Sequence, residues 1–416
     1  MVKNIFAKIA VLPILLISLS VYAQQNPNPL SLEDCIILAE KNNELIQIQI
    51  QKIEQAKQVL RQARGALLPE VDFVFVQTLK DTSGSSASGN STDSKITASQ
   101  PLFYGFTLKN VVAIAEAQSR VSELELKNVQ RALESDTAKA FYALAQAESD
   151  LKNTEDTLDK MAEREKVLIT RVTIGKSRES ELFMLQSQIS VLQSNRQKIS
   201  GVRKKASEQL AFLTGIDAKD IVIADTAMEP SGVDAVESII DKAQNRSDIK
   251  LAEENLRTQE KKIKVAQGLR LPTVDLNGTY YAARSGSMAD SKWDTGLSLN
   301  MPLYQGGIIK SGISEEKLKL QEYTQALAQS RKRVKTEILQ LHSSIESSLA
   351  QVSALKSAYS KAQLSYELQL KDYSVGLVNN LDVIQATLTL LDVRNNLNGA
   401  IIQSKLNKVL LEIAVK

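Results

Sequence analysis

The sequence contains one cysteine and one histidine, two residue types that often carry nucleophilic or metal chemistry. Cys35 has no second thiol with which to form a disulfide or a thiolate metal site, so a small buried apolar role fits it best. His342 lies in a helical stretch without a second His or Cys to complete a zinc site. No phosphate-binding loop or convergent set of Ser, His and Asp accompanies them. The residues therefore predict no catalytic site, no cofactor and no bound metal, and an enzyme is the least favoured class.

The first residues have the pattern of an export signal. Lys3 and Lys8 precede an apolar run at 9–20, which ends in Val-Tyr-Ala at 21–23. This run is shorter than the roughly 20 apolar residues of a membrane-spanning helix. We therefore expect a cleaved signal peptide at 1–23 and an exported protein. Cys35 lies beyond the cleavage site, so it is not a lipid-bearing first residue.

The composition favours long helices. The 416 residues include 8 prolines and 17 glycines, and Ala, Leu, Ser, Gln, Lys and Glu dominate the rest. The net charge of +3 is close to balance, and no basic block indicates a nucleic-acid partner.

Two short motifs occur twice. Leu-Pro-x-Val-Asp is found at 68–72 and at 271–275, and Pro-Leu-(Phe/Tyr)-x-Gly at 101–105 and at 302–306. The offset between copies is 203 residues from Pro69 to Pro272 and 201 residues from Pro101 to Pro302. A nearly constant offset indicates an internal duplication. We therefore divide the mature chain into a first repeat at 24–213, a linker at 214–235 and a second repeat at 236–416.

Each repeat has one segment in which apolar and polar residues alternate with the period of a strand. These segments, 70–103 and 273–304, each predict a pair of strands about 10 residues long. One face is apolar and aromatic, while the other carries mainly Asp, Asn, Ser and Thr. The connections at 81–94 and 284–290 are predicted to be surface loops, which would lie outside the cell where the strand pairs face lipid.

The remaining sequence is predicted to be helical. A first helix is expected at 31–66, where Ser31 and Asp34 form a capping pair. Residues 107–172 contain neither proline nor glycine and carry heptad-spaced apolar residues, which return after a break at 173–177. The second repeat has a similar break at 374–377. We therefore expect two antiparallel coiled-coil hairpins, 107–213 and 308–416, with a possible short strand at 221–223 in the linker.

These pieces predict a tube that ends in a membrane. Strands of about 10 residues with one apolar face fit an outer-membrane barrel, which must close so that no edge is left unpaired in lipid. Four strands cannot close, because about eight is the practical minimum. A dimer would contribute eight strands and give only a tight barrel. Three chains, which together contribute twelve strands, are the next larger assembly and the expected one. The predicted fold class is thus mainly α, with an α-barrel of duplicated helical hairpins and a shared transmembrane β-barrel.

The doubled motifs, the Tyr-Ser-Val-Gly-Leu turn at 373–377 and Leu-Asp-Val at 381–383 resemble TolC-like outer-membrane efflux proteins. The resemblance covers nearly the whole mature chain. It implies a homotrimer in the outer membrane of a Gram-negative cell, with a helical barrel that crosses the periplasm. It also implies an exit duct that works with an inner-membrane pump through a periplasmic adaptor. The helix-hairpin tips would contact that adaptor, through Thr173, Gly175, Ser374, Gly376 and Leu377.

Asp382 and Tyr373 are candidate residues of a closed periplasmic gate. Threefold symmetry would bring three Asp382 carboxylates towards one axis, where they would attract cations. The equally favoured alternative is a carboxylate that only stabilises the positive end of a helix. Well-known family members add an Arg and a second Asp nearby, but here those positions hold Val378 and Gln385. The resemblance therefore implies a looser gate than theirs.

The alternative function is a periplasmic coiled-coil adaptor or scaffold without a pore. Adaptors also contain long helical hairpins, but they lack two alternating hairpins with apolar outer faces. The motifs do not distinguish drugs, metal ions, siderophores and proteins as exported substrates.

Overall fold

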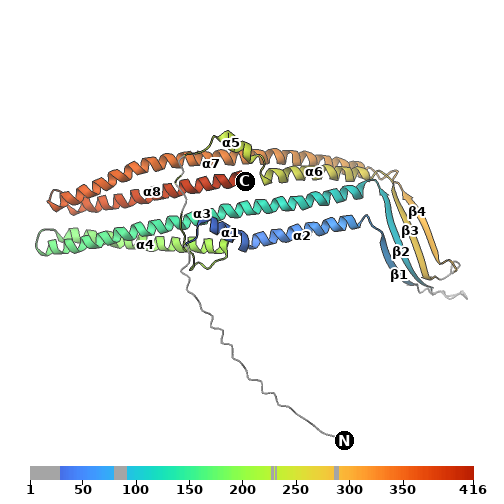
Figure 1. The fold of residues 1–416 in the computed structure, drawn as a ribbon, viewed down its shortest axis with the longest axis horizontal. Helices are drawn as coiled ribbons and strands as arrows, with labels where there is room; N and C mark the ends of the chain where they lie inside the picture. The colour runs from blue at the N-terminus through green and yellow to red at the C-terminus, as the bar shows by residue number, and fades with distance from the viewer. Residues whose placement is uncertain (1–28, 79–90, 226–228, 230–231, 285–289) are drawn as a thin grey trace, which may run out of the picture.

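The computed structural model describes residues 29–78, 91–225, 229, 232–284 and 290–416, so the predicted signal peptide lies outside the described residues. Long helices run along one axis, and a β-sheet lies at one end of them (Figure 1). The first half contains α1 (Leu32–Asn42), α2 (Glu44–Gly65), β1 (Glu70–Thr78), β2 (Ser91–Tyr104), α3 (Thr107–Thr173) and α4 (Glu179–Thr214). The second half contains α5 (Val236–Ala243), α6 (Ser247–Gly268), β3 (Thr273–Ala283), β4 (Trp293–Asn300), α7 (Ile308–Ser374) and α8 (Asn380–Val415).

Corresponding helices of the two halves have the same lengths. Helices α2 and α6 have 22 residues each, α3 and α7 have 67, and α4 and α8 have 36. Helices of 67 residues are about 100 Å long at 1.5 Å per residue. Only α1 and α5 differ, with 11 and 8 residues.

The long helices pack as two antiparallel hairpins that lie side by side in the order α4, α3, α8, α7 (Figure 1). Nearer the sheet, α2 takes the place of α4 beside α3, and α6 takes the place of α8 between α3 and α7. Heptad positions form the cores between them, as the sequence predicts. One such core contains Met161, Leu168, Leu185, Leu192, Ile384 and Leu391.

The helix expected at 31–66 is instead two helices, which meet at Asn43. The capping pair of Ser31 and Asp34 forms as predicted. The backbone of Asn43, however, is extended, and its side-chain Oδ1 accepts a hydrogen bond from the Leu45 amide at 2.9 Å to cap α2. The Asn43 side-chain Nδ2 also donates to the Leu213 carbonyl at the end of α4, at 3.4 Å. Contact with a distant helix end thus favours a break that local sequence does not require.

The described strands form one antiparallel sheet in the order β1-β2-β3-β4. Its register places Phe73 opposite Ile96 in the first hairpin and Leu276 opposite Leu297 in the second. Because side chains alternate, one face exposes a row of large apolar residues, which includes Val71, Phe73, Phe75, Trp293, Leu297 and Leu299. The other face is polar, with Asn277 hydrogen-bonded to both Ser99 and Ser298 at 3.0 Å.

Two strand boundaries differ from the sequence prediction. Residues 91–94, which the sequence places in the first loop, belong to β2, while most of both loops (79–90 and 285–289) lies outside the described residues. The second strand pair is expected to reach residue 304, but β4 ends at Asn300. Strand β2 continues to Tyr104 because β3 pairs with it there, opposite Thr273. No described strand lies beyond β4 to hold residues 301–304 in the same way.

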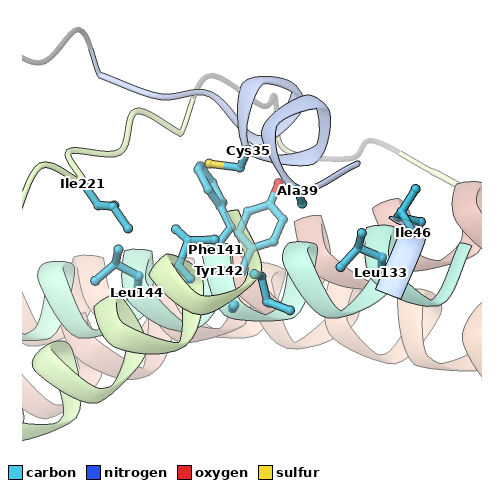
Figure 2. Close-up of a cluster of buried hydrophobic side chains, with 11 residues drawn as sticks. Cys35, Ala39, Ile46, Leu133, Phe141, Tyr142, Leu144 and Ile221 are labelled. Atoms are coloured by element: carbon cyan, nitrogen blue, oxygen red, sulfur yellow. The ribbon is translucent and has the colours of Figure 1, made fainter. Parts of the chain in front are cut away.

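A compact core lies midway along the helices, where α1 covers α3 (Figure 2). Phe141 and Tyr142 of α3 are fully buried there, and Cys35 of α1 is buried against the same cluster. The linker adds Ile221 to this core. An isolated β-bridge joins Leu30 to Ile223, so the short strand suggested for 221–223 is present only as this one bridge.

Candidate functional site: the helical tips

Two tight turns lie at the end of the helices farthest from the sheet, one between α3 and α4 and one between α7 and α8 (Figure 1). Gly175 and Gly376 occupy the left-handed region of the backbone, with φ of +71° and +83°. The Gly175 amide donates to the Val172 carbonyl at 2.9 Å, and the Gly376 amide donates to the Tyr373 carbonyl at 3.1 Å. Such hydrogen bonds satisfy carbonyl groups at the end of a helix.

The five predicted contact residues all lie on these two turns. The hydroxyl groups of Thr173 and Ser374 donate to carbonyls one turn earlier, those of Ile169 (2.9 Å) and Lys371 (2.6 Å). A Cβ added to Gly175 or Gly376 would meet no atom within 4 Å, so the space above each glycine is open. Large apolar side chains are exposed beside them: Ile174, Val375, Leu377 and, at the start of α4, Phe183. The tips thus combine unoccupied space beside two glycines with exposed apolar side chains.

Tyr373, a predicted gate residue, is held by two arginines of α3. The guanidinium carbons of Arg164 and Arg171 lie 4.3 Å and 4.6 Å from the centre of its ring. A cation within about 6 Å of an aromatic ring is attracted by the negative ring face. This contact joins α3 of the first half to α7 of the second half.

Arg164 also connects to α8. Its Nε donates to Asn380 Oδ1 at 2.7 Å, and Asn380 is only 1% exposed. Arg164 Nη2 and Asn380 Nδ2 are buried donors without a hydrogen-bond partner. Burial lowers the pKa of Arg164, because it disfavours the charged form, while Tyr373 and Tyr366 act in the opposite direction. One side chain therefore links three helices near the tip.

Asp382 caps α8. Its Oδ2 accepts a hydrogen bond from the Asn379 amide at 3.1 Å, and its own amide donates to Asn379 Oδ1 at 3.2 Å. This reciprocal capping box is the helix-start interaction that the sequence offers as one of two interpretations. Asp382 is half-buried, and the predicted ring of three carboxylates would need other copies of the chain, so the gate role remains a prediction.

A groove of about 360 Å³ lies between α3, α7 and α8 beside Tyr373. Lys160, Arg164 and Arg171 line it together with Tyr366 and Tyr373, and Glu163 is its acidic residue. The surroundings of Tyr373 are therefore basic.

Sequence reasoning did not identify Arg164, Arg171 or Asn380. A signal was present, because Arg164 and Arg171 are seven residues apart and so share one face of α3. Asn380, however, lies more than 200 residues away in sequence and meets Arg164 only through packing.

The residues with nucleophilic or metal chemistry form no site in the described part of the chain. Burial raises the pKa of the Cys35 thiol to about 11, which makes this thiol a poor nucleophile. His342 Nε2 lies 3.2 Å from the Asp234 carbonyl, and Nδ1 lies 3.6 Å from Glu346. No group of three or more His, Cys, Asp or Glu in those residues is arranged to hold a metal ion. Among the described helices, none combines the length and apolar composition needed to cross a membrane.

Comparison with known proteins identifies the class to which this fold and these tips belong. The profile of the outer membrane efflux protein family matches residues 36–216 and 239–411, which is most of the chain. The chain belongs to the outer membrane efflux protein family. The family consists of non-enzymatic transport proteins of the outer membrane, so the protein is an outer-membrane exit duct.

Individual relatives agree with this assignment. The chain is 23% identical over 385 residues to the outer membrane protein TolC of Salmonella enteritidis, covering 87% of this chain and 77% of the relative. A membrane protein from Pseudomonas aeruginosa has a similar structure, with a TM-score of 0.82 at 17% identity and 92% of each chain covered. The outer membrane protein VceC of Vibrio cholerae has a TM-score of 0.81 at 16% identity, covering 92% of this chain and 95% of the other.

Proposed function

We propose that three copies of this chain form a channel that exports substrates through the periplasm and the outer membrane, together with a periplasmic adaptor and an inner-membrane transporter. Each copy contributes four strands to a closed twelve-stranded barrel, and the helical hairpins of the three copies form the continuous tube below it. The repeats at 24–213 and 236–416, joined by the linker at 214–235, then serve as six similar units around the tube.

The observation that carries this proposal is the isolated four-stranded sheet. Its exposed apolar face fits lipid, but β1 and β4 each have one edge without a strand partner among the described residues. Unpaired backbone groups at such edges cost several kcal/mol each in lipid, so a membrane sheet must close. Closure by further copies satisfies both edges at once.

The tips are the proposed adaptor-binding surface. Gly175 and Gly376 leave open space, and Ile174, Val375 and Leu377 offer apolar contacts to a partner. A helical hairpin with small or apolar residues fits this surface, because the backbone glycines let it approach closely. Tyr373 and Asp382, which lie beside the same turn, are the proposed gate residues.

The alternative function, an adaptor without a pore, does not agree with membership of the family. The two functions also differ in a direct experiment on the purified protein. The channel needs detergent for extraction, has the mass of three chains by light scattering and conducts ions in a planar lipid bilayer. Extraction by salt alone, or a monodisperse monomer with full helical and sheet signal in circular dichroism, would contradict the proposal.

A further inference from the structure

The internal duplication allows contacts between subunits to be derived from contacts within one chain. The hairpin register repeats with the motif offsets: the pair Phe73 and Ile96 corresponds to the pair Leu276 and Leu297. The positions are related by 203 residues before each loop and by 201 residues after it. A contact between the turn after the first strand pair and the helix end before the second strand pair therefore has a counterpart. That counterpart lies between the turn after the second strand pair and the helix end before a first strand pair.

The first of these junctions lies within the chain. Gly105, in the turn after β2, has φ of +58° and lies against Gly268, the last residue of α6. A Cβ on Gly105 would overlap the Gly268 carbonyl oxygen and lie 2.9 Å from Leu271 Cβ. Conversely, a Cβ on Gly268 would overlap the Gly105 carbonyl oxygen and lie 2.6 Å from Thr107 Cγ2. Two backbones meet here at a distance that only glycine on both sides permits.

The second junction has the corresponding two glycines, but within one chain they do not contact each other. Gly306 corresponds to Gly105 and has nearly the same φ, +57°, while Gly65 corresponds to Gly268 and ends α2. Both glycines are exposed, and a Cβ on either would meet nothing within 4 Å. Because they lie at opposite edges of the sheet, Gly306 and Gly65 of one chain do not meet.

The exposed residues before Gly306 agree with a missing neighbour. Leu303 is 89% exposed and Tyr304 is 88% exposed. The corresponding Leu102 is 55% exposed, and Phe103 is half-buried because β3 pairs with it opposite Val274. Residues 301–304, which follow β4, thus lack the cover that β3 gives to the corresponding residues after the first strand pair.

We propose that Gly306 of one subunit packs against Gly65 of the next, as Gly105 packs against Gly268 within the chain, and that this contact gives the pairing of β4 with the next subunit's β1 the register of β2 with β3. The proposal rests on the trimer proposed above and defines how its subunits join. The chain-internal pairs Thr97 with Thr279 and Ser99 with Asn277 then correspond to Ser298 with Val76 and Asn300 with Val74 of the next subunit.

The alternation of the strands supports this register. It places Leu299 opposite Phe75 of the next subunit, and both side chains belong to the exposed apolar face. A slip of one residue would turn Phe73 and Phe75 to the side of the sheet that carries Asn277. The partner is therefore a second copy of this chain, because only a copy provides both the matching edge and the matching glycine.

A substitution at Gly65 tests the proposed contact between subunits. Gly65 lies at the end of a helix without a positive φ, and a Cβ added to it would meet no atom of its own subunit within 4 Å. Gly65→Leu should leave the helical circular dichroism of the subunit unchanged but lower the fraction of trimer in detergent at least tenfold. Gly312→Val is the matched control: Gly312 also has open space, and its counterpart Val111 is an exposed valine, so this variant should remain trimeric.

A cysteine pair tests the register directly. Ser298→Cys combined with Val76→Cys should give disulfide-linked dimers and trimers on a non-reducing gel, while Ser298→Cys combined with Phe75→Cys, which faces the opposite side, should not. The native Cys35 is fully buried and does not interfere. A trimeric Gly65→Leu protein, or linkage by the second pair alone, overturns the junction but leaves the trimer standing. A wild-type protein that is never trimeric overturns the proposed function itself.

Discussion

The guanidinium group of Arg164 lies 4.3 Å from the ring centre of Tyr373, and this contact joins the helical hairpin of the first half to that of the second half. Arg171 lies against the same ring at 4.6 Å. If the tube opens by separating the two hairpins at the tip, both cation–π contacts and the Arg164–Asn380 hydrogen bond must break. Under the proposed function, these contacts would oppose an opening of that kind.

The first prediction concerns Tyr373. Removal of the ring by Tyr373→Leu should shift the channel towards the open state, since each cation–π interaction contributes roughly 0.5–2 kcal/mol. Single-channel recordings should show an open probability that is higher by a factor of about 2 to 30 for each cation–π interaction that the substitution removes. Tyr373→Phe is the control, because it keeps the ring and should behave like the wild type. Equal open probability in all three proteins would show that Tyr373 does not restrain the tip.

The second prediction concerns the adaptor surface. Gly376→Trp should abolish export while the trimer and membrane insertion persist, because the side chain would fill the open space at the tip. Gly376→Asn controls for the backbone, since asparagine tolerates the left-handed region better than most residues. We expect it to retain most export. Export is measured as the minimum inhibitory concentration of a transported compound in a deletion strain. Loss of the trimer in Gly376→Trp would instead indicate a purely structural glycine.

The sequence predicts those parts of the fold that local periodicity determines. The change from helical to alternating patterns at Pro69 and Pro272 locates the strands, and the glycines after α3 and α7 locate the tips. The break at Asn43 was missed because one contact that favours it, the hydrogen bond from Asn43 Nδ2 to the Leu213 carbonyl, involves a residue far along the chain.

The cluster around Tyr373 was missed for a similar reason. Its members come from α3, α7 and α8, and each residue taken alone resembles an ordinary polar residue on a helix surface. Only the packing of the two hairpins shows that the partly buried Arg164 is hydrogen-bonded to the buried Asn380. The sequence periodicity of one helix does not reveal which polar residues of the other two helices will contact it.

The third prediction concerns acid stability. Arg246, whose side chain is 4% exposed, pairs with Asp248 at 2.8 Å and with Glu337 at 2.9 Å, and it donates to the Ala414 carbonyl. Burial alone would raise the pKa of Asp248, but the hydrogen bonds and charge of Arg246, with help from Arg131, lower it overall. A carboxylate with a lowered pKa in the folded state stabilises the fold above its unfolded pKa of about 4. This stabilisation is lost as the pH falls through the folded value.

Asp248→Asn should therefore reduce stability at pH 7 by about 2 kcal/mol, the contribution of a hydrogen bond to a charged group. Below about pH 4 the difference between variant and wild type should shrink, because the wild-type carboxylate is then protonated as well. Melting temperatures in detergent across this range measure both effects. Glu253→Gln, which removes a partly exposed pair with Arg331, should cause little change at any pH. A constant difference from pH 7 to pH 3 would contradict the linkage.

The last prediction decides between the two interpretations of Asp382. If three Asp382 carboxylates face the pore, Asp382→Ala should weaken the block of current by multivalent cations added from the periplasmic side. The same substitution also breaks the capping box, which costs about 1 kcal/mol. Asn379→Ala breaks that box without changing the charge, so it separates the two effects. Weaker block in Asp382→Ala alone identifies a gate carboxylate. Unchanged block and conductance would assign Asp382 to helix capping and place the gate at other residues.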